Sequence, residues 1–316
     1  MATARAPYEP VIIGADIGNA TTSIARPDGA AAFFPSVIAD STRAYDGMSK
    51  IATDRHHVTY KGQHAVVGLD AFEMHGDTIL NETAAPHARY VDETSLLCFL
   101  AGIGAAFPTT DTVGVRLATG APLSIYEAHG AEIAALYQGT HEFTYNGHAR
   151  HVIVERVTVH GEGREAWRLL TTEQRRGNVA VHDVGGKTWN VLLFKDGALK
   201  AFRTYDYGTE RMLDDVPAIS RDAATRWAIQ AEMRRDPKAR ADVRTALDKV
   251  ISRTLVRIEA KVALTQAHRH ALMGGGAVYL QNAIKARYNA PTLMLGGKAP
   301  EGANALAYAL AASEAA

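Results

Sequence analysis

Continuous apolar runs followed by tight turns predict a first group of strands in this chain. Residues 11–15 are apolar without interruption, which is typical of a central strand buried on both faces. A turn at residues 16–19 follows, and we expect two further strands at residues 22–25 and 31–34. The chain therefore opens with three strands joined by two short turns.

The same order of strand, turn, strand, turn and strand returns in the second half of the chain. We expect a strand at residues 178–181, a turn at residues 183–186, and two strands at residues 189–194 and 198–203. The simplest explanation for a pattern that occurs twice, about half a chain apart, is an internal duplication.

Periodic apolar positions predict helices between and after these strands. Residues 93–107 are apolar on nearly all sides of a helix, which should therefore lie against a sheet, whereas residues 242–261 have one apolar face. The other expected elements are strands at residues 58–60, 65–67, 113–119, 142–145, 151–159, 270–273 and 292–295, and helices at residues 125–137, before residue 287, and at residues 304–312. Together they predict an α/β protein with two halves.

The length of the chain, 316 residues, exceeds what one simple core needs and suits two domains. We expect a loose tail over residues 1–10, a first domain over residues 11–170, and a second domain over residues 171–301. The second domain includes an expected helical subdomain at about residues 208–268, and the C-terminal helix within residues 302–316 should pack back onto the first domain.

Composition and charge narrow the function classes. Hydrophobic residues make up 47% of the chain and charged residues 22%, as in ordinary globular proteins. Lys plus Arg and Asp plus Glu are equal at 34 each, so no net field favours nucleic acid or a membrane as a direct partner. Residues 1–10 lack the apolar centre of a signal peptide, and the longest apolar stretch, residues 96–107, is shorter than the ~20 residues that span a bilayer. We therefore expect a cytoplasmic protein.

Cysteine and histidine usage argues against a metal centre built on these residues. The single cysteine, Cys98, excludes an internal disulfide and a cysteine-based zinc site, and its apolar surroundings predict a buried side chain. The 13 histidines show no metal-binding spacing, so we expect them at surface or core positions. Residues 221–261 carry more basic than acidic side chains. A solvated helix face explains this excess first, a filament contact or acidic partner second, and direct DNA binding third.

The turn after the first strand has the chemistry of a phosphate site. A short turn between strands presents successive main-chain N–H groups to an anion, and Gly18 lets a phosphate approach the backbone closely. Thr21 and Thr22 add hydroxyl donors. A carboxylate next to phosphate requires a cation between them, so Asp16 implies Mg²⁺.

The turn of the second half repeats this chemistry with Asp183, Gly185, Gly186 and Thr188. Either turn alone is equally consistent with a plain hairpin in which the aspartate accepts hydrogen bonds from turn amides. Two copies, each after a buried strand and each with hydroxyl groups nearby, favour phosphate binding.

A third motif, Gly274-Gly275-Gly276, lies between an expected strand and an expected helix. Three glycines allow a flat ring to lie on the backbone, and the helix N-terminus contributes a positive dipole end. The sequence that follows is not that of a P-loop, and the glycine spacing is not that of a dinucleotide fold. A tight turn without a ligand is the alternative.

In this order and spacing, the three motifs resemble those of the actin, sugar kinase and heat-shock chaperone superfamily. The resemblance is closer to bacterial and archaeal actin-like proteins of the plasmid-partitioning ParM type, and it covers nearly the whole chain in pieces. The matching stretches are residues 15–19, 119–123, 157–162, 183–188, 273–277 and 302–308.

The resemblance implies an actin-like fold in which a nucleotide lies in a cleft between two related α/β domains. It implies that Asp16 and Asp183 hold Mg²⁺ through water, and that Glu162 orients the attacking water, with Glu165 as the alternative. The residues implied to contact phosphates or adenosine are Gly18, Asn19, Thr21, Thr22, Gly185, Gly186, Lys187, Thr188, Gly274, Gly275 and Gly276. The expected nucleotide is ATP, with GTP as the alternative.

Two positions depart from the pattern of the relatives. Many of them have lysine where this chain has Ser23, and the second hairpin commonly ends in aspartate where this chain has Asn190. Asparagine keeps the hydrogen-bonding shape of aspartate but lacks its charge. Lys187 is a candidate to replace the missing lysine, or it points into solvent. Both changes concern the rate of hydrolysis more than the fold.

We therefore expect a cytomotive ATPase that polymerises with nucleotide bound and depolymerises after hydrolysis. Its filament would move or position cargo such as a plasmid through an adaptor protein that links it to DNA. Filament formation follows from the resemblance alone, because a fold does not fix a function. The alternatives are a non-polymerising enzyme of the same superfamily, such as a sugar kinase or exopolyphosphatase, and a nucleotide-bound scaffold that hydrolyses slowly.

Overall fold

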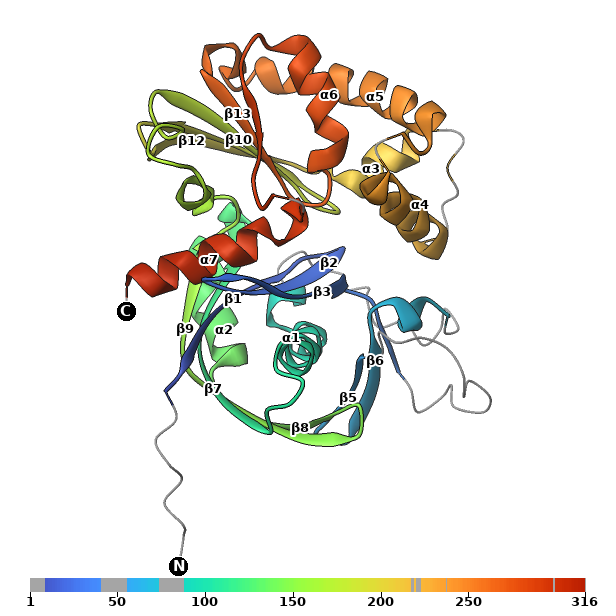
Figure 1. The fold of residues 1–316 in the computed structure, drawn as a ribbon, viewed down its shortest axis with the longest axis vertical. Helices are drawn as coiled ribbons and strands as arrows, with labels where there is room; N and C mark the ends of the chain where they lie inside the picture. The colour runs from blue at the N-terminus through green and yellow to red at the C-terminus, as the bar shows by residue number, and fades with distance from the viewer. Residues whose placement is uncertain are drawn as a thin grey trace, which may run out of the picture. The chain divides into compact units, whose positions relative to one another are not determined.

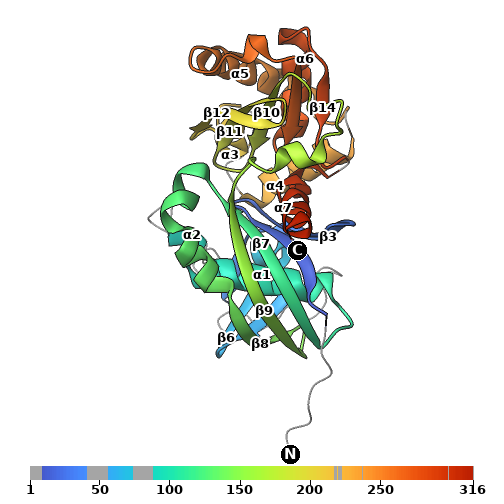
Figure 2. The same ribbon diagram turned by 90° about the vertical axis from the view of Figure 1, so that its left-hand side faces the viewer.

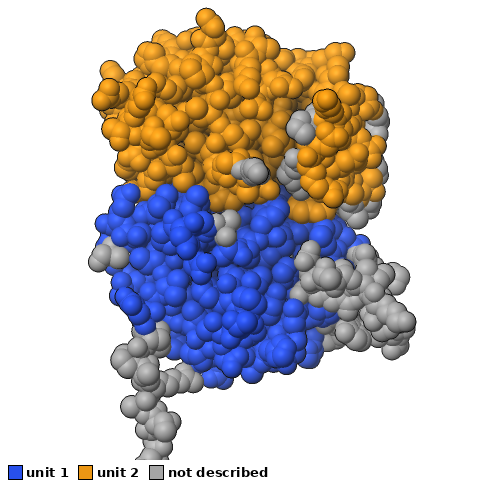
Figure 3. Space-filling model, in the orientation of Figure 1, with its two compact units in different colours: residues 1–161, 305–316 blue, residues 162–304 orange. Residues whose placement is uncertain are grey.

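The computed structural model describes residues 9–40, 56–73, 88–216, 219, 223–236, 238–297 and 299–315. Most of the expected tail at residues 1–10 and part of the expected helical subdomain at 208–268 lie outside these ranges. The chain divides into two compact units (Figure 3). Unit 1 comprises residues 1–161 and 305–316, and unit 2 comprises residues 162–304.

Unit 1 is built on a sheet whose described part has nine strands in the order β3-β2-β1-β7-β9-β8-β5-β6-β4. The sheet curves around helix α1 (Figure 1). Strand β1 runs parallel to β7, and β7 runs parallel to β9, while the other pairs are antiparallel. The strands are β1 Val11–Ile17, β2 Thr21–Arg26, β3 Gly29–Pro35, β4 Ile38–Asp40, β5 His56–Tyr60, β6 Gln63–Val67, β7 Thr112–Ala121, β8 Gly139–Tyr145 and β9 His148–Gly161.

Helix α1 (Glu93–Ala106) is the centre of the unit 1 core. Its N-terminus is capped by Asp92, whose carboxylate accepts a hydrogen bond from the main-chain N–H of Ser95 at 3.0 Å. The predicted all-round apolar character is confirmed, because every residue from 95 to 104 is buried and the helix contacts strands on several sides of the curve. The helix is therefore enclosed by the sheet and does not lie on a flat face.

The other described helices of unit 1 contact this sheet or helix α1. Helix α2 (Leu123–Tyr137) contacts β7 and β9, and the short helices η2 (Leu69–Glu73) and η4 (Ala88–Val91) precede α1 in the chain. Within unit 1, the last helix, α7 (Ala303–Glu314), lies directly on β1. A Cβ atom added at Gly14 would lie 1.9 Å from the carbonyl oxygen of Ala305, so only glycine allows this close approach.

Unit 2 is built on a five-stranded sheet among its described residues, in the order β12-β11-β10-β13-β14. Helix α6 contacts β10, β13 and β14 and packs against α5 (Figure 2). The predicted one-faced helix is α5, which buries its apolar stripe and exposes the opposite face. The elements are β10 Asn178–Val184, β11 Trp189–Lys195, β12 Ala198–Tyr205, β13 Arg269–Met273, β14 Thr292–Met294, α3 Thr209–Asp214, α4 Ala223–Arg235, α5 Ala241–Glu259, α6 Ala277–Arg287, η5 Ala166–Leu169, η6 Leu264–Gln266 and η7 Pro300–Gly302.

The two units share one strand topology, as the predicted duplication requires. Strands β3-β2-β1-β7-β9 correspond to β12-β11-β10-β13-β14, because each series has two antiparallel pairs followed by two parallel pairs. The registers also correspond, since Asp16 lies opposite Ser23 and Asp183 lies opposite Asn190. The α/β fold class with two related halves is therefore confirmed.

Candidate functional site

The β1–β2 and β10–β11 turns, which we call the first and second hairpins, have the same backbone geometry. The N–H of Gly18 donates to the carbonyl oxygen of Thr21 at 2.9 Å, and the N–H of Gly185 donates to that of Thr188 at 2.9 Å. Thr21 and Thr188 are therefore equivalent positions. Thr22 lies one residue further on, is fully buried, and has its hydroxyl 2.8 Å from that of Ser36.

In the second hairpin, Asp183 is held by an asparagine from the far end of the chain. The Nδ2 of Asn304 donates to Asp183 Oδ2 at 3.0 Å, and the Oδ1 of Asn304 accepts from the main-chain N–H of Gly163 at 3.0 Å. Asp183 and Asn304 are both buried. The side-chain amide of Asn304 thus connects the end of β10 to Gly163, which follows Glu162.

Glu162 is held in the same way by Asn190. The Nδ2 of Asn190 donates to Glu162 Oε2 at 3.1 Å, and the hydroxyl of Thr204 donates to Asn190 Oδ1 at 2.7 Å. A carboxylate only accepts hydrogen bonds, so the amide must turn its NH₂ group to Glu162 and its oxygen to Thr204. Asn190 therefore orients Glu162, which is 8% exposed.

Burial and hydrogen bonding shift the pKa of the Asp183 carboxylate in opposite directions. Burial raises the pKa of Asp183 above its ordinary value, while the hydrogen bonds from Asn304 and Asn190 lower it. Two neutral amides thus favour the ionised form of a carboxylate that has little contact with water. An aspartate at position 190 would instead bring a further negative charge next to Glu162 and Asp183.

The glycine motif packs against the end of β10, close to Asp183. Gly274 has a φ of +80°, and a Cβ atom there would lie 2.4 Å from the carbonyl oxygen of Val184 and 2.9 Å from Asp183 Oδ1. The N–H of Gly276 donates to the same Val184 oxygen at 2.9 Å. A Cβ atom at Gly275 would meet no atom within 4 Å, so this glycine faces open space.

The predicted site residues fall into two groups, one in each unit. Unit 2 brings together Glu162, Asp183 and the glycine motif, with Gly186 buried, Gly185 and Thr188 half-buried and Lys187 exposed. Unit 1 places the predicted residues Asp16, Gly18, Asn19 and Thr21 together at the first hairpin, all half-buried.

The first hairpin also has a partner that the sequence did not reveal. Arg89, from helix η4, is 8% exposed and donates a hydrogen bond from Nη2 to the carbonyl oxygen of Gly18. Asn304 and Thr204 were likewise missed as site residues. The available signals were an asparagine at the start of an otherwise apolar final helix and an arginine just before an apolar one. Neither signal identifies its partner without the tertiary structure.

The donor set fits Mg²⁺ and a phosphate ligand better than a transition-metal centre. The described residues contain no group of three or more His, Cys, Asp or Glu side chains placed to hold a metal ion. Mg²⁺ needs only one or two protein carboxylates, because it keeps several waters and binds phosphate oxygens. Asp16 in unit 1 and Asp183 in unit 2 are each a single carboxylate of this kind, next to a glycine turn.

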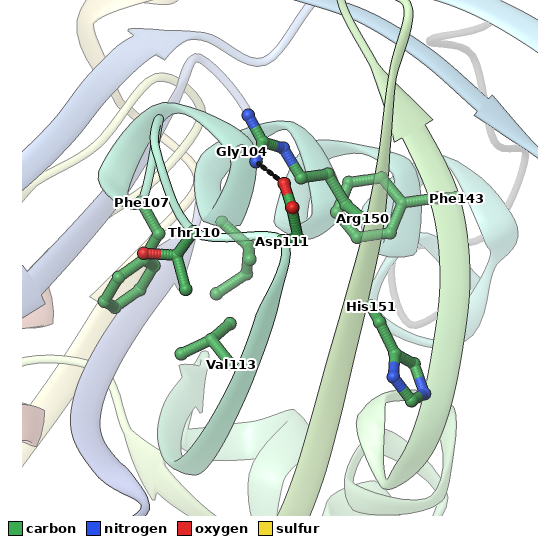
Figure 4. Close-up of a pocket in the computed structure, with 9 residues that line it drawn as sticks. Gly104, Phe107, Thr110, Asp111, Val113, Phe143, Arg150 and His151 are labelled. Atoms are coloured by element: carbon green, nitrogen blue, oxygen red, sulfur yellow. Dashed lines mark hydrogen bonds and ion pairs between the residues drawn. The ribbon is translucent and has the colours of Figure 1, made fainter. Parts of the chain in front are cut away.

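Figure 4 shows a cavity in unit 1 whose lining includes no residue of the first hairpin. Its volume is about 10 Å³, which is room for about one water molecule, so it is not a nucleotide site. It is lined by the C-terminal end of α1 and by Arg150, which makes an ion pair with Asp111 at 3.1 Å.

Two further expectations concern residues outside the hairpins. Cys98 is a buried free thiol, and burial raises its pKa to about 11, so it has the predicted structural character. Trp189 is fully buried in the core of unit 2. None of the described helices combines the length and the hydrophobicity needed to cross a bilayer.

Comparison with known proteins agrees with the geometry. Residues 14–163 match the family model described as the N-terminal domain of actin-like proteins. Ta0583, an archaeal actin homologue, has a similar structure with a TM-score of 0.74 at 16% identity, over 96% of this chain and 99% of that chain. No curated protein has a sequence that matches this chain.

Two other solved structures are similar over nearly their whole length. Bacillus thuringiensis ParM with ATP has a TM-score of 0.70 at 16% identity, over 96% of this chain and 98% of that chain. The AlfA filament bound to AMPPNP has a TM-score of 0.65 at 16% identity, over 97% of this chain and 98% of that chain. The duplicated strand order, the paired hairpins and these likenesses agree: the chain has an actin-like fold similar to that of ParM, and residues 14–163 match the N-terminal domain model of actin-like proteins.

Proposed function

We propose that this protein is a nucleotide-dependent, filament-forming ATPase that positions cargo such as a plasmid within the cytoplasm. The observation that carries the proposal is the buried group in unit 2, where Asp183 and Glu162 are each held by an asparagine amide. A structural hairpin has no need for two buried carboxylates, whose desolvation is unfavourable. Pre-oriented carboxylates next to glycine turns suit phosphate hydrolysis, which depends mainly on positioning and charge neutralisation.

The predicted residues have roles in this proposal, except Thr22, whose fully buried hydroxyl lies 2.8 Å from that of Ser36. Asp16 and Asp183 would hold Mg²⁺ through water, and the ion, when bound, neutralises charge on phosphate oxygens. The main-chain amides of both hairpins would donate to the phosphates, assisted by the hydroxyls of Thr21 and Thr188. Residues Asn19, Gly186 and Lys187 would lie along the phosphates, and the glycines at 274–276 would face the adenosine.

Glu162 is the better of the two candidates for orienting the attacking water. Its alternative, Glu165, makes an ion pair with Arg168 at 2.7 Å, which occupies its carboxylate. Asn190 fixes one carboxylate oxygen of Glu162, so the carboxylate needs little reorganisation when water binds.

Polymerisation is the second part of the proposal. It is supported by the likeness to AlfA, which is known as a filament bound to AMPPNP. The expected partners are further copies of this chain and an adaptor protein that connects the filament to DNA. We propose ATP rather than GTP as the nucleotide, because a similar ParM structure contains ATP.

One experiment tests binding, assembly and hydrolysis together. Mg-ATP or Mg-GTP is added to the protein, and light scattering, sedimentation and phosphate release are followed in parallel. We expect pelletable polymer and slow phosphate release. Absence of polymer over a broad range of protein concentrations with both nucleotides refutes the filament proposal, whereas polymer without phosphate release would identify a scaffold.

Glu162→Ala tests the catalytic assignment, with the exposed Glu173→Ala as its matched control. Phosphate release should fall on the order of 100-fold in the first variant while assembly persists, because a positioned base is lost. The control should behave like the wild type. Unchanged turnover in Glu162→Ala would remove this residue from the mechanism.

A further inference from the structure

The first hairpin contains an acidic residue but no cation of its own. From Asp16 to Ser23 there is no lysine or arginine, whereas the second hairpin contains the exposed Lys187. Arg89, from helix η4, donates a hydrogen bond to the Gly18 carbonyl oxygen of this hairpin. Any positive charge at this hairpin therefore has to come from outside its own sequence.

The internal duplication shows that holding this turn does not require a charge. In the second hairpin, the equivalent carbonyl oxygen, that of Gly185, accepts a hydrogen bond from the main-chain N–H of Thr209 at 2.9 Å. In unit 2 the turn carbonyl therefore accepts a hydrogen bond from an uncharged N–H at the start of α3, whereas in unit 1 it accepts one from the Arg89 guanidinium. The charge on Arg89 is more than the turn needs.

The guanidinium of Arg89 is also incompletely paired. Its Nε is buried and has no hydrogen-bond partner, and no ion pair of Arg89 is found within the described part of the chain. The Nε of Arg150 in the same unit is likewise buried without a partner, but the guanidinium of Arg150 makes an ion pair with the carboxylate of Asp111 at 3.1 Å (Figure 4). A buried cation without a carboxylate is unfavourable unless an anion neutralises it.

We propose that Arg89 is a nucleotide-binding residue that places its positive charge on the phosphates at the first hairpin. A guanidinium has five N–H donors, so one can hold the Gly18 oxygen while others bind phosphate oxygens in a forked geometry. The ligand class is a nucleoside triphosphate, and the inference rests on the function proposed above. Arg89 thus supplies from helix η4 the charge that the hairpin sequence lacks.

The test compares affinities for Mg-ATP and for adenosine, measured by isothermal titration calorimetry. Arg89→Gln keeps a neutral donor for Gly18 but removes the charge, so we expect Mg-ATP to bind about 10- to 100-fold more weakly and adenosine to bind unchanged. Ser23→Lys, added to Arg89→Gln, should restore most of the Mg-ATP affinity, because position 23 lies opposite Asp16 on the same face of the hairpin. Arg150→Gln, the matched control, should not change either affinity.

Several results would overturn the proposal. Unchanged Mg-ATP affinity in a folded Arg89→Gln variant, or equal losses of affinity for Mg-ATP and adenosine, would show that Arg89 only stabilises the turn. If the variant does not fold, the Nε–H resonance of Arg89 in the wild type is followed by NMR, and a shift with Mg-ATP but not with adenosine is expected. No shift would refute the proposal. If the wild type binds no nucleotide at all, the proposed function itself fails, which is a separate outcome.

Discussion

Asn304→Ala should destabilise unit 2 strongly, because this one amide makes two buried hydrogen bonds. Its Nδ2 donates to Asp183 and its Oδ1 accepts from the N–H of Gly163, each at 3.0 Å. The bond to a charged acceptor contributes about 1.5–3 kcal/mol, and an unsatisfied buried N–H costs about 1–3 kcal/mol. We therefore expect a loss of about 3–5 kcal/mol in the free energy of unfolding.

The loss is measured by urea unfolding without nucleotide at pH 7.5, followed by far-UV circular dichroism. In thermal unfolding, about 1 kcal/mol corresponds to about 2–4 °C in a unit of this size, so the Tm should fall by roughly 10 °C. Asn282→Ala, at an exposed position of helix α6, is the matched control and should lose less than about 0.5 kcal/mol. A loss below about 1 kcal/mol in Asn304→Ala would refute the reasoning.

A second variant tests whether the interaction is electrostatic. Asn304→Asp places a carboxylate against Asp183, and two adjacent carboxylates raise the pKa of the pair in the folded state. A raised folded pKa gives stability that is present at low pH and is lost as pH rises through that pKa. Asn304→Asp should therefore be less stable than Asn304→Ala at pH 8 and should regain stability toward pH 5. The same loss at both pH values would contradict this explanation.

Further substitutions test the packing at two glycines and the burial of His270. Gly274→Ala should lose about 3 kcal/mol or more in urea unfolding, because the added Cβ would lie 2.4 Å from the Val184 carbonyl oxygen at a φ of +80°. Gly14→Ala should lose a similar amount by forcing α7 away from β1, whereas Gly302→Ala, with no atom within 4 Å of its added Cβ, should change little. Burial lowers the pKa of His270 from 6.5 to about 4, so the unfolded chain takes up a proton below pH 6.5 that the folded chain excludes. Between pH 6.5 and pH 5 this lowers wild-type stability by about 2 kcal/mol, and His270→Gln should reduce that pH dependence; an equal dependence in both proteins would refute the assignment.

Local patterns were enough to predict the hairpins and their repetition. Strand β10 is buried on both faces because it is central in its sheet, and the apolar run at residues 179–181 makes this visible in the sequence. The turn after it is marked in the sequence by Gly185 and Gly186, which are typical turn residues. The same holds for the capped, fully apolar helix α1.

The functional neighbourhoods depend on contacts between residues far apart in the chain, and no local pattern encodes these. In the sequence, Asn190 differs from the aspartate of the relatives by the loss of a charge. The structure shows that its amide donates a hydrogen bond to Glu162 and accepts one from Thr204. Asn304 reaches Asp183 from the last helix, and Arg89 reaches Gly18 from η4.

The sequence by itself therefore determined the α/β class, the duplicated hairpins and the phosphate chemistry, because these follow from hydrophobic periodicity and from turn residues only a few positions apart. Tertiary structure alone decided how each carboxylate and each turn is held, because a hydrogen bond depends on distance and angle in space. Such a bond selects its partner only after the sheets have brought distant segments together.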